Sequence, residues 1–220
     1  MLNIRYAIDG ATRRNGKPDC VAAGAVVCQI FDETGPQYQK VITVHEHGST
    51  NQRGEMLALL EAITHFCSSD FDECQIITDS EYLFNTIHND WLTKWSGTWT
   101  TSKGEPVKNR DIWELILRLI QGTDKTINIY HIKGHIIPMG KATVRRLIDK
   151  DDNGISLLVA CVDKFRSYTI DEEKLANLQE LSVKNNGFEL TDDVLEVFIT
   201  MNTTADNIAG YVADKADAVR

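Results

Sequence analysis

The stretch Tyr6-Ala7-Ile8-Asp9-Gly10 constrains the fold of this chain more than any other segment. Its apolar run ends on a carboxylate and a glycine, which is typical of a buried strand that delivers an acid to a site. Three later segments, around Glu55, Asp79 and Asp206, also place an acid at the end of a predicted strand or near the start of a predicted helix. The sequence therefore raises the question whether four acids that are far apart along the chain meet at one place.

The order of the predicted elements indicates an α/β fold. Alternating or continuous apolar runs predict strands over residues 3–9, 23–31, 39–47, 74–78 and 126–132. Helical spacing predicts a helix that starts at Thr50 or Asn51, a second after Asp79 and a third from Asn109 to Leu119. The resulting order, βββαβαβ, predicts a five-stranded mixed sheet with helices packed on it.

The character of the chain changes over residues 136–201. Two apolar segments, 144–148 and 155–162, flank an Asn153-Gly154 dipeptide, and this pattern predicts a β-hairpin. Helix-start patterns then follow at Thr169, Thr191 and about Thr204. Residues 136–201 are thus expected to form a small α+β subdomain.

Composition restricts the class of protein. The formal net charge of −9 argues against a protein that binds nucleic acid by net charge alone, although carboxylates gathered around a metal also raise the acidic count. The five cysteines form no C-x-x-C pair, which favours reduced thiols over a zinc or disulfide framework. No apolar run approaches the roughly 18 residues of a membrane span, and no signal peptide is evident, so we expect a cytoplasmic protein without a membrane partner.

Four clustered carboxylates have a specific chemical use. Hard divalent cations such as Mg²⁺ prefer oxygen ligands, and two such ions about 4 Å apart can activate a water on one side of a phosphodiester and stabilise the leaving oxygen on the other. Taken singly, Asp9, Glu55 and Asp79 are each best explained as ordinary turn or cap residues. Taken together, they predict a metal site.

At these positions the chain resembles the type 1 ribonuclease H family. Its first three metal motifs correspond to Asp9-Gly10-Ala11, to the segment from Thr50 to Glu55, and to the segment from Thr78 to Tyr82. The segment with Trp91, Trp95 and Trp99 and the Ile132-Lys133-Gly134-His135 loop follow in the family's order. The helical spacing of the three tryptophans favours core packing over substrate contact, and Trp113 is also expected in the core.

The resemblance implies an endonuclease that hydrolyses the RNA strand of an RNA–DNA hybrid with two Mg²⁺ ions, or Mn²⁺ in their place. Asp9 would bridge both ions, Asp206 would complete the water-activating site, and Glu55 with Asp79 would hold the ion at the leaving oxygen. His135 would act in catalysis from a mobile loop. Substrate binding is implied for Asn15, Asn51 and Gln52 at the minor groove and for Thr50 and Asn109 at a DNA phosphate.

One departure from the family concerns the last acid. An insertion of about sixty residues separates His135 from the segment Asn202-Thr203-Thr204-Ala205-Asp206, which resembles the family's closing motif. Asp206 is therefore predicted as the fourth ligand, with Asp214 as its rival. The expected organisation is a catalytic core over residues 1–135, an insertion over 136–201 and a closing helix over 202–220.

Two other function classes stay open at this point. Another nuclease or recombinase of the ribonuclease H-like superfamily would act on DNA with a similar acidic site, but the set of Asn51, Gln52 and His135 favours the first function. A non-catalytic hybrid-binding protein is the third class, and the intact acids argue against it. A monomer is expected.

Overall fold

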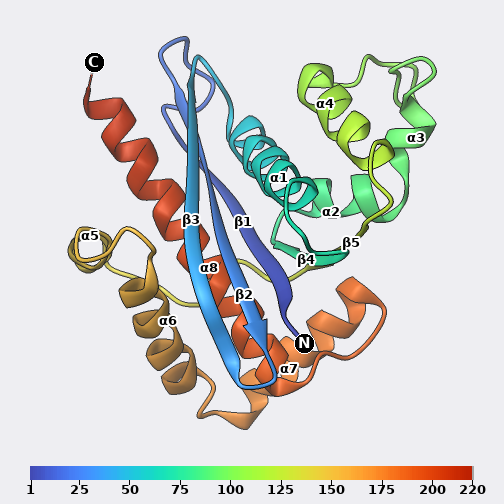
Figure 1. Cartoon of the computed structure of the whole chain (residues 1–220). Coiled ribbons are helices and arrows are strands. Elements are labelled where there is room, and N and C mark those ends of the chain that lie inside the picture. The colour runs from blue at the N-terminus through green and yellow to red at the C-terminus, as the bar shows by residue number, and fades with distance from the viewer. Residues whose placement is uncertain (220) are drawn as a thin grey trace.

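The computed structural model describes residues 1–219 as a five-stranded sheet with helices on both faces (Figure 1). The strands are β1 (Asn3–Arg13), β2 (Val21–Asp32), β3 (Gly35–His47), β4 (Glu73–Thr78) and β5 (Thr126–His131). The helices are α1 (Asn51–Cys67), α2 (Glu81–His88), α3 (Trp91–Trp95), α4 (Arg110–Gln121), α5 (Lys141–Ile148), α6 (Ile155–Tyr168), α7 (Glu172–Asn186) and α8 (Asp192–Ala218). The spatial order is β3-β2-β1-β4-β5, with antiparallel pairing among β1 to β3 and parallel pairing of β1 with β4 and of β4 with β5. The predicted order βββαβαβ and the mixed sheet are confirmed.

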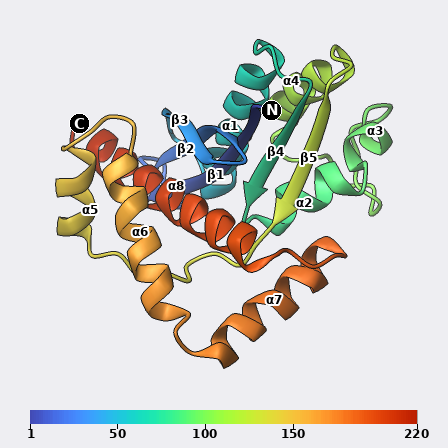
Figure 2. The same ribbon diagram turned by 60° about the horizontal axis from the view of Figure 1, so that its bottom comes forward.

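Strand β1 lies in the middle of the sheet and is buried on both faces. Ile4, Tyr6 and Ile8 point into the core beneath α1, while Ala7 belongs to the core beneath α8. The small side chain of Ala7 lets α8 lie close to the sheet, and the buried Asn202 amide of α8 donates to the Ile8 carbonyl at 3.4 Å. Figure 2 shows α8 crossing the sheet on the face opposite α1. Asp9 therefore follows a segment that both helices hold in place.

Three glycines allow α1 to approach the sheet. A Cβ atom on Gly10 would lie 2.4 Å from the Glu55 backbone nitrogen, and one on Gly24 would lie 2.4 Å from the Gly54 carbonyl oxygen. A Cβ atom on Gly54 would in turn lie 2.6 Å from the Ala23 carbonyl oxygen. The first turn of α1 thus rests on the backbone of β1 and β2, which places Glu55 beside the end of the apolar run in β1.

Gly24→Ala is expected to destabilise the protein by about 1–3 kcal/mol, because the added methyl group meets backbone atoms that cannot rotate away. The measurement is the urea midpoint of the purified protein. Gly97→Ala is the matched control, since a Cβ atom there has nothing within 4 Å. Equal midpoints for the two variants would show that α1 does not depend on this contact.

The predicted β-hairpin over residues 144–162 is wrong, because the two segments form helices α5 and α6. The buried residues of α6, Leu157, Cys161 and Phe165, recur every four positions, which is a helical period rather than a strand period. Gly154 does not form a hairpin turn; it adopts a left-handed conformation directly before α6. The Asp151 carboxylate accepts the first backbone N–H groups of α6, from Ile155 at 2.8 Å and Ser156 at 2.9 Å.

Of the three helix starts predicted after residue 168, the one at Thr191 is confirmed and the other two differ from the structure. Asp171 caps α7, while Thr169 instead ends α6, where its hydroxyl donates to the Phe165 carbonyl at 3.0 Å. The last helix does not begin near Thr204, because α8 is continuous from Asp192 and is capped by Thr191. Within α8 the Thr204 hydroxyl donates to a carbonyl one turn earlier, so this poor helix former is accommodated inside the helix.

Residues 136–201 are consequently all helical outside their connecting loops, and the expected α+β subdomain contains no strand among residues 136–201. The boundary predicted between residues 201 and 202 falls inside α8, whose first half packs with α6 and whose middle lies on the sheet. The division of the chain into core, insertion and closing helix stays a prediction.

The tryptophans are placed differently from one another. Trp113 is fully buried and Trp99 nearly so, whereas Trp91 and Trp95 are half-buried on α3. Trp99 lies beyond the end of α3 and has a positive φ of 53°, so the three regularly spaced tryptophans do not share one helix.

Over residues 1–219, no helix combines the length and the apolar character that a membrane span requires.

Candidate active site

Asp9 is the most buried acid of the site, with only 6% of its surface exposed. Its Oδ1 atom accepts the Gly10 backbone N–H at 2.6 Å, but its Oδ2 atom is buried without a hydrogen-bond partner among the described residues. Burial raises the pKa of Asp9 well above its ordinary value, and the nearby Asp79, Asp206 and Glu55 raise this pKa further. A buried carboxylate oxygen without a partner is unfavourable unless a cation or proton joins it. Asp9 is therefore suited to bind a cation.

Glu55 is the fifth residue of α1, and its charge is among those that raise the pKa of Asp9. Its carboxylate accepts the Asn51 side-chain amide at 2.9 Å and the Ser80 hydroxyl at 2.6 Å. Burial raises the pKa of Glu55. Ser80 follows Asp79 directly, so one short segment after β4 both supplies an acid and orients another.

Asp79 follows the last residue of β4, which pairs in parallel with β1. The loop after β5 packs against it, because a Cβ atom on Gly134 would lie 1.8 Å from the Asp79 Oδ2 atom. Burial raises the pKa of Asp79, His135 lowers it and Asp206 raises it. Only glycine thus fits at position 134 without moving the loop or the carboxylate.

Asp206 comes from the middle of α8 and faces His135. The His135 Nδ1 atom lies 3.5 Å from the Asp206 Oδ2 atom, and the histidine side chain is 77% exposed on a residue with a positive φ of 56°. Burial raises the pKa of Asp206, while His135 and Arg13 lower it. The four predicted acids and the loop histidine thus act on one another electrostatically beside Asp9 within β1 and at the end of β4.

The rival acid Asp214 has different neighbours. It forms an ion pair with Arg13 and lies 3.6 Å from the Lys141 amine, and hydrogen bonding to Arg13 lowers its pKa. Asp206 is among the charges that raise the pKa of Asp9 most. The structure therefore brings Asp206 to the other acids, while the assignment of the fourth metal ligand stays a prediction.

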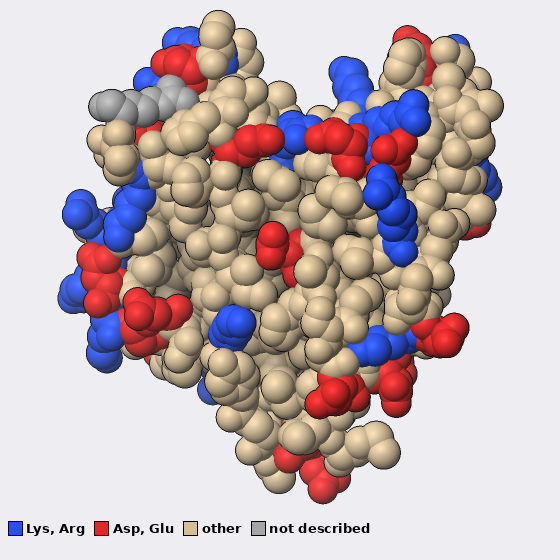
Figure 3. Space-filling model, turned by 45° about the horizontal axis from the view of Figure 1, so that its top comes forward, with Lys and Arg blue, Asp and Glu red and all other residues tan. Residues whose placement is uncertain are grey.

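The donor set fits a hard divalent cation. Every acid offers carboxylate oxygens, and the Oδ2 atom of Asp9 has no hydrogen-bond partner within residues 1–219. Among residues 1–219, no three His, Cys, Asp or Glu side chains stand close enough together to enclose an ion unaided. Mg²⁺ tolerates this arrangement, because it keeps several waters and takes only one or two carboxylates directly. On the face in Figure 3, acidic atoms lie near the centre within mostly uncharged surface, and charged side chains of both signs lie around the edges.

The five residues predicted to bind substrate lie together. They line a hollow of about 670 Å³ that also includes Glu55 and Lys108. These five residues are Asn15, Thr50, Asn51, Gln52 and Asn109. The hollow is mainly polar and opens beside the acids through Glu55, so a ligand seated in it lies next to the site.

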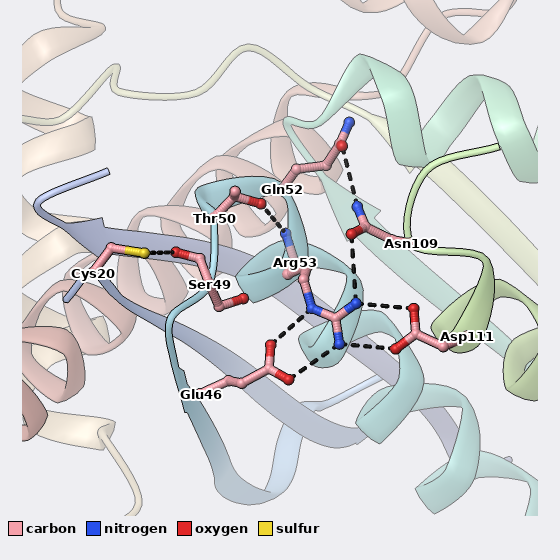
Figure 4. A network of polar contacts seen from close by, with 8 residues as sticks. All are labelled: Cys20, Glu46, Ser49, Thr50, Gln52, Arg53, Asn109 and Asp111. Atoms are coloured by element: carbon pink, nitrogen blue, oxygen red, sulfur yellow. Dashed lines mark hydrogen bonds and ion pairs between the residues drawn. The ribbon is translucent and has the colours of Figure 1, made fainter. Parts of the chain in front are cut away.

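Arg53 holds the floor of this hollow in place, and sequence reasoning assigned it no role. Its guanidinium donates to the carboxylates of Glu46 at 2.8 Å and Asp111 at 2.9 Å, and to the Asn109 side-chain oxygen at 3.5 Å (Figure 4). The two carboxylates raise the pKa of Arg53. The Asn109 amide also donates to the Gln52 side chain at 3.3 Å. Because Glu46 and Asp111 lie on different elements, no local sequence pattern indicates this network.

Comparison with known proteins gives a consistent picture. The RNase H family model matches residues 3–147. The ribonuclease H of Syntrophomonas wolfei is 33% identical over 136 residues, which are 61% of this chain and 86% of that protein. The ribonuclease H of Prosthecochloris aestuarii is 38% identical over 131 residues, which are 58% of this chain and 80% of that protein.

Two solved structures share the fold. The solution structure of the PFV RNase H domain has a TM-score of 0.51 at 24% identity and covers 68% of this chain and 91% of that one. LC9-RNase H1, described as a type 1 RNase H with the type 2 active-site motif, has a TM-score of 0.51 at 18% identity and covers 60% of this chain and 63% of that one. The family match ends at residue 147, so Asp206 lies outside it.

Proposed function

Because the chain belongs to the ribonuclease H family, we propose that it is an endonuclease that hydrolyses the RNA strand of RNA–DNA hybrids with two divalent cations, Mg²⁺ or Mn²⁺. The observation that carries this proposal is the buried, unpartnered Oδ2 atom of Asp9 among three further carboxylates. The polar hollow beside Glu55 supplies the place for the substrate.

The acids divide into roles around Asp9. Asp9 would hold both ions, Asp206 would complete the site of the attacking water, and Glu55 with Asp79 would hold the ion at the leaving oxygen. When bound, the two cations lower the pKa of a water and stabilise the charge that develops on the leaving group. Ser80 and Asn51 orient Glu55 through their hydrogen bonds to its two carboxylate oxygens.

His135 would transfer a proton, and the residues that line the hollow would bind the substrate. His135 is highly exposed and lies next to Asp206, so it can carry a proton between the site and solvent. Asn15, Asn51 and Gln52 line the hollow with amide groups that can bond to ribose 2′-hydroxyl groups, the feature that distinguishes RNA from DNA. Thr50 and Asn109 at its rim would bind a phosphate of the DNA strand.

The test compares labelled duplexes of one sequence as RNA–DNA, DNA–DNA and RNA–RNA, each incubated with the protein and Mg²⁺. Cleavage is expected only in the RNA strand of the hybrid and is expected to stop in EDTA. Cleavage of DNA would instead indicate a DNA nuclease or recombinase of the superfamily. Binding of the hybrid without cleavage in either Mg²⁺ or Mn²⁺ would indicate a non-catalytic hybrid-binding protein.

A further inference from the structure

A second hollow, of about 680 Å³, lies on the other side of Asp206, between the end of β1, helix α5 and the last turns of α8. Its lining includes Asp206 together with Arg13, Lys141, Arg145, Asp214 and Lys215. The first hollow contains Glu55 and the second contains Asp206, and both of these acids act electrostatically on Asp9. The two hollows share no lining residue, and each includes one member of the acid set, which consists of Asp9, Glu55, Asp79 and Asp206.

Helix α5 is held against α8 by specific contacts. The Tyr211 hydroxyl of α8 donates to the carboxylate of Asp149, the residue that ends α5, at 2.5 Å. Val144 of α5 is also buried in the core that includes residues of α8. The wall that α5 forms is therefore part of the folded structure.

The charge of this wall is opposite to that of the whole chain. The chain carries a net charge of −9, yet residues 141–150 contain four basic residues and one acid. The side chains of Lys141 and Arg145 are 85% and 75% exposed, and their nearest carboxylates, Asp214 and Asp149, lie at 3.6 Å and 3.9 Å. Exposed pairs of this kind contribute little to stability, so these cations are available to a ligand. In Figure 3, lysine and arginine side chains lie among acidic ones along the left flank, the side on which Figure 1 shows α5.

We propose that α5 is a second nucleic-acid-binding wall, in which Lys141 and Arg145 bind backbone phosphates of the RNA–DNA hybrid on the Asp206 side of the active site. This inference rests on the proposed function, because it takes the hybrid as the occupant. The hollow is continuous with the acid set, and its cations match the regular negative charge of a nucleic-acid backbone. Arg13 is less available, since it already pairs with Asp214 and donates to the Gly210 carbonyl at 2.7 Å.

The experiment measures binding of a fluorescent RNA–DNA hybrid to the full chain in EDTA, where no cleavage occurs, over a series of salt concentrations. Lys141→Gln/Arg145→Gln is expected to weaken binding roughly 5- to 30-fold at 0.1 M salt, and to lower the slope of log affinity against log salt by about one to two. The control, Lys174→Gln/Lys184→Gln, removes two exposed charges from α7 and is expected to change neither quantity. Identical behaviour of the two double variants would overturn the inference.

Cleavage data keep the two proposals separate. If the protein cleaves hybrids while the α5 variant binds them as tightly as the unmodified protein, the role of α5 is wrong and the proposed function stands. If the protein binds hybrids through α5 and cleaves none, the proposed function is wrong and the role of α5 stands. Lys141 and Arg145 are exposed, so thermal melting of the α5 variant is expected to match that of the unmodified protein.

Discussion

Asp9→Asn is expected to reduce cation-dependent hydrolysis of the hybrid by roughly 10³-fold or more, which corresponds to the loss of about 4 kcal/mol of transition-state stabilisation. The substitution keeps the shape of the side chain but removes the charge that would hold both cations. Single-turnover cleavage of the labelled hybrid in Mg²⁺ measures the effect. Asp70→Asn is the control, because Asp70 is exposed and lies outside the acid set.

The same substitution is expected to stabilise the cation-free protein. Burial and the neighbouring acids raise the pKa of Asp9, so the folded state binds its proton more tightly than the unfolded state does. The stability that this protonation provides is complete below the unfolded pKa of about 4 and is lost as the pH rises through the raised folded pKa. The amide introduced by Asp9→Asn is neutral at every pH, so the variant does not lose this stability as the pH rises. At pH 7 in EDTA, Asp9→Asn is therefore expected to raise the free energy of unfolding by roughly 1–3 kcal/mol.

Thermal melts with and without Mg²⁺ complete the test. Mg²⁺ is expected to stabilise the unmodified protein, since it binds only the folded acid set, and to stabilise Asp9→Asn much less. A variant that is both less stable in EDTA and fully active in Mg²⁺ would contradict the role of Asp9 as the shared ligand.

The second large effect is a loss of hydrolysis that is expected for Asp206→Asn and not for Asp214→Asn. Asp206→Asn is expected to lower hydrolysis by roughly 10²-fold or more, because Asp206 would complete the site of the attacking water. Asp214→Asn is expected to leave hydrolysis within about threefold, which is less than 1 kcal/mol. Asp214 pairs with Arg13 and lies close to Lys141, whereas the charge of Asp206 raises the pKa of Asp9.

Both variants are measured with the same hybrid at saturating concentration, over a series of Mg²⁺ concentrations. The rate of hydrolysis is expected to depend less cooperatively on the Mg²⁺ concentration in Asp206→Asn, but not in Asp214→Asn. If Asp214→Asn abolished cleavage while Asp206→Asn retained it, the assignment of the fourth ligand would be reversed.

Much of the sheet was predictable because its signals are local. The apolar run before Asp9 and the alternation in the next two strands have the period of a strand, and the structure extends these strands without changing their order. The gathering of Asn15, Asn51 and Gln52 around one hollow followed from the family resemblance rather than from local pattern. The contact of Gln52 with Asn109 depends on the position of α4, which no local pattern specifies.

The failures have physical causes that a short window of sequence does not contain. The Asn153-Gly154 dipeptide suits a hairpin turn, but the carboxylate of Asp151 and the left-handed Gly154 instead start a helix. Arg53 takes its importance from Glu46 and Asp111, which come from β3 and α4. The continuity of α8 through Thr204 depends on burial against the sheet, which outweighs the weak helix propensity of that residue.

Asp206 also sets the order in which the acid set is completed as the chain folds. Strands β1 and β2 pair through a short connection, whereas α8 reaches β1 only by closing a loop of almost the whole chain, as the bond from Asn202 to Ile8 illustrates. Contacts of such long range form slowly, because the entropy of loop closure opposes them until the intervening chain is ordered. A chain still emerging from the ribosome would thus present Asp9, Glu55 and Asp79 without Asp206, and the proposed hydrolysis would have to wait until α8 has docked.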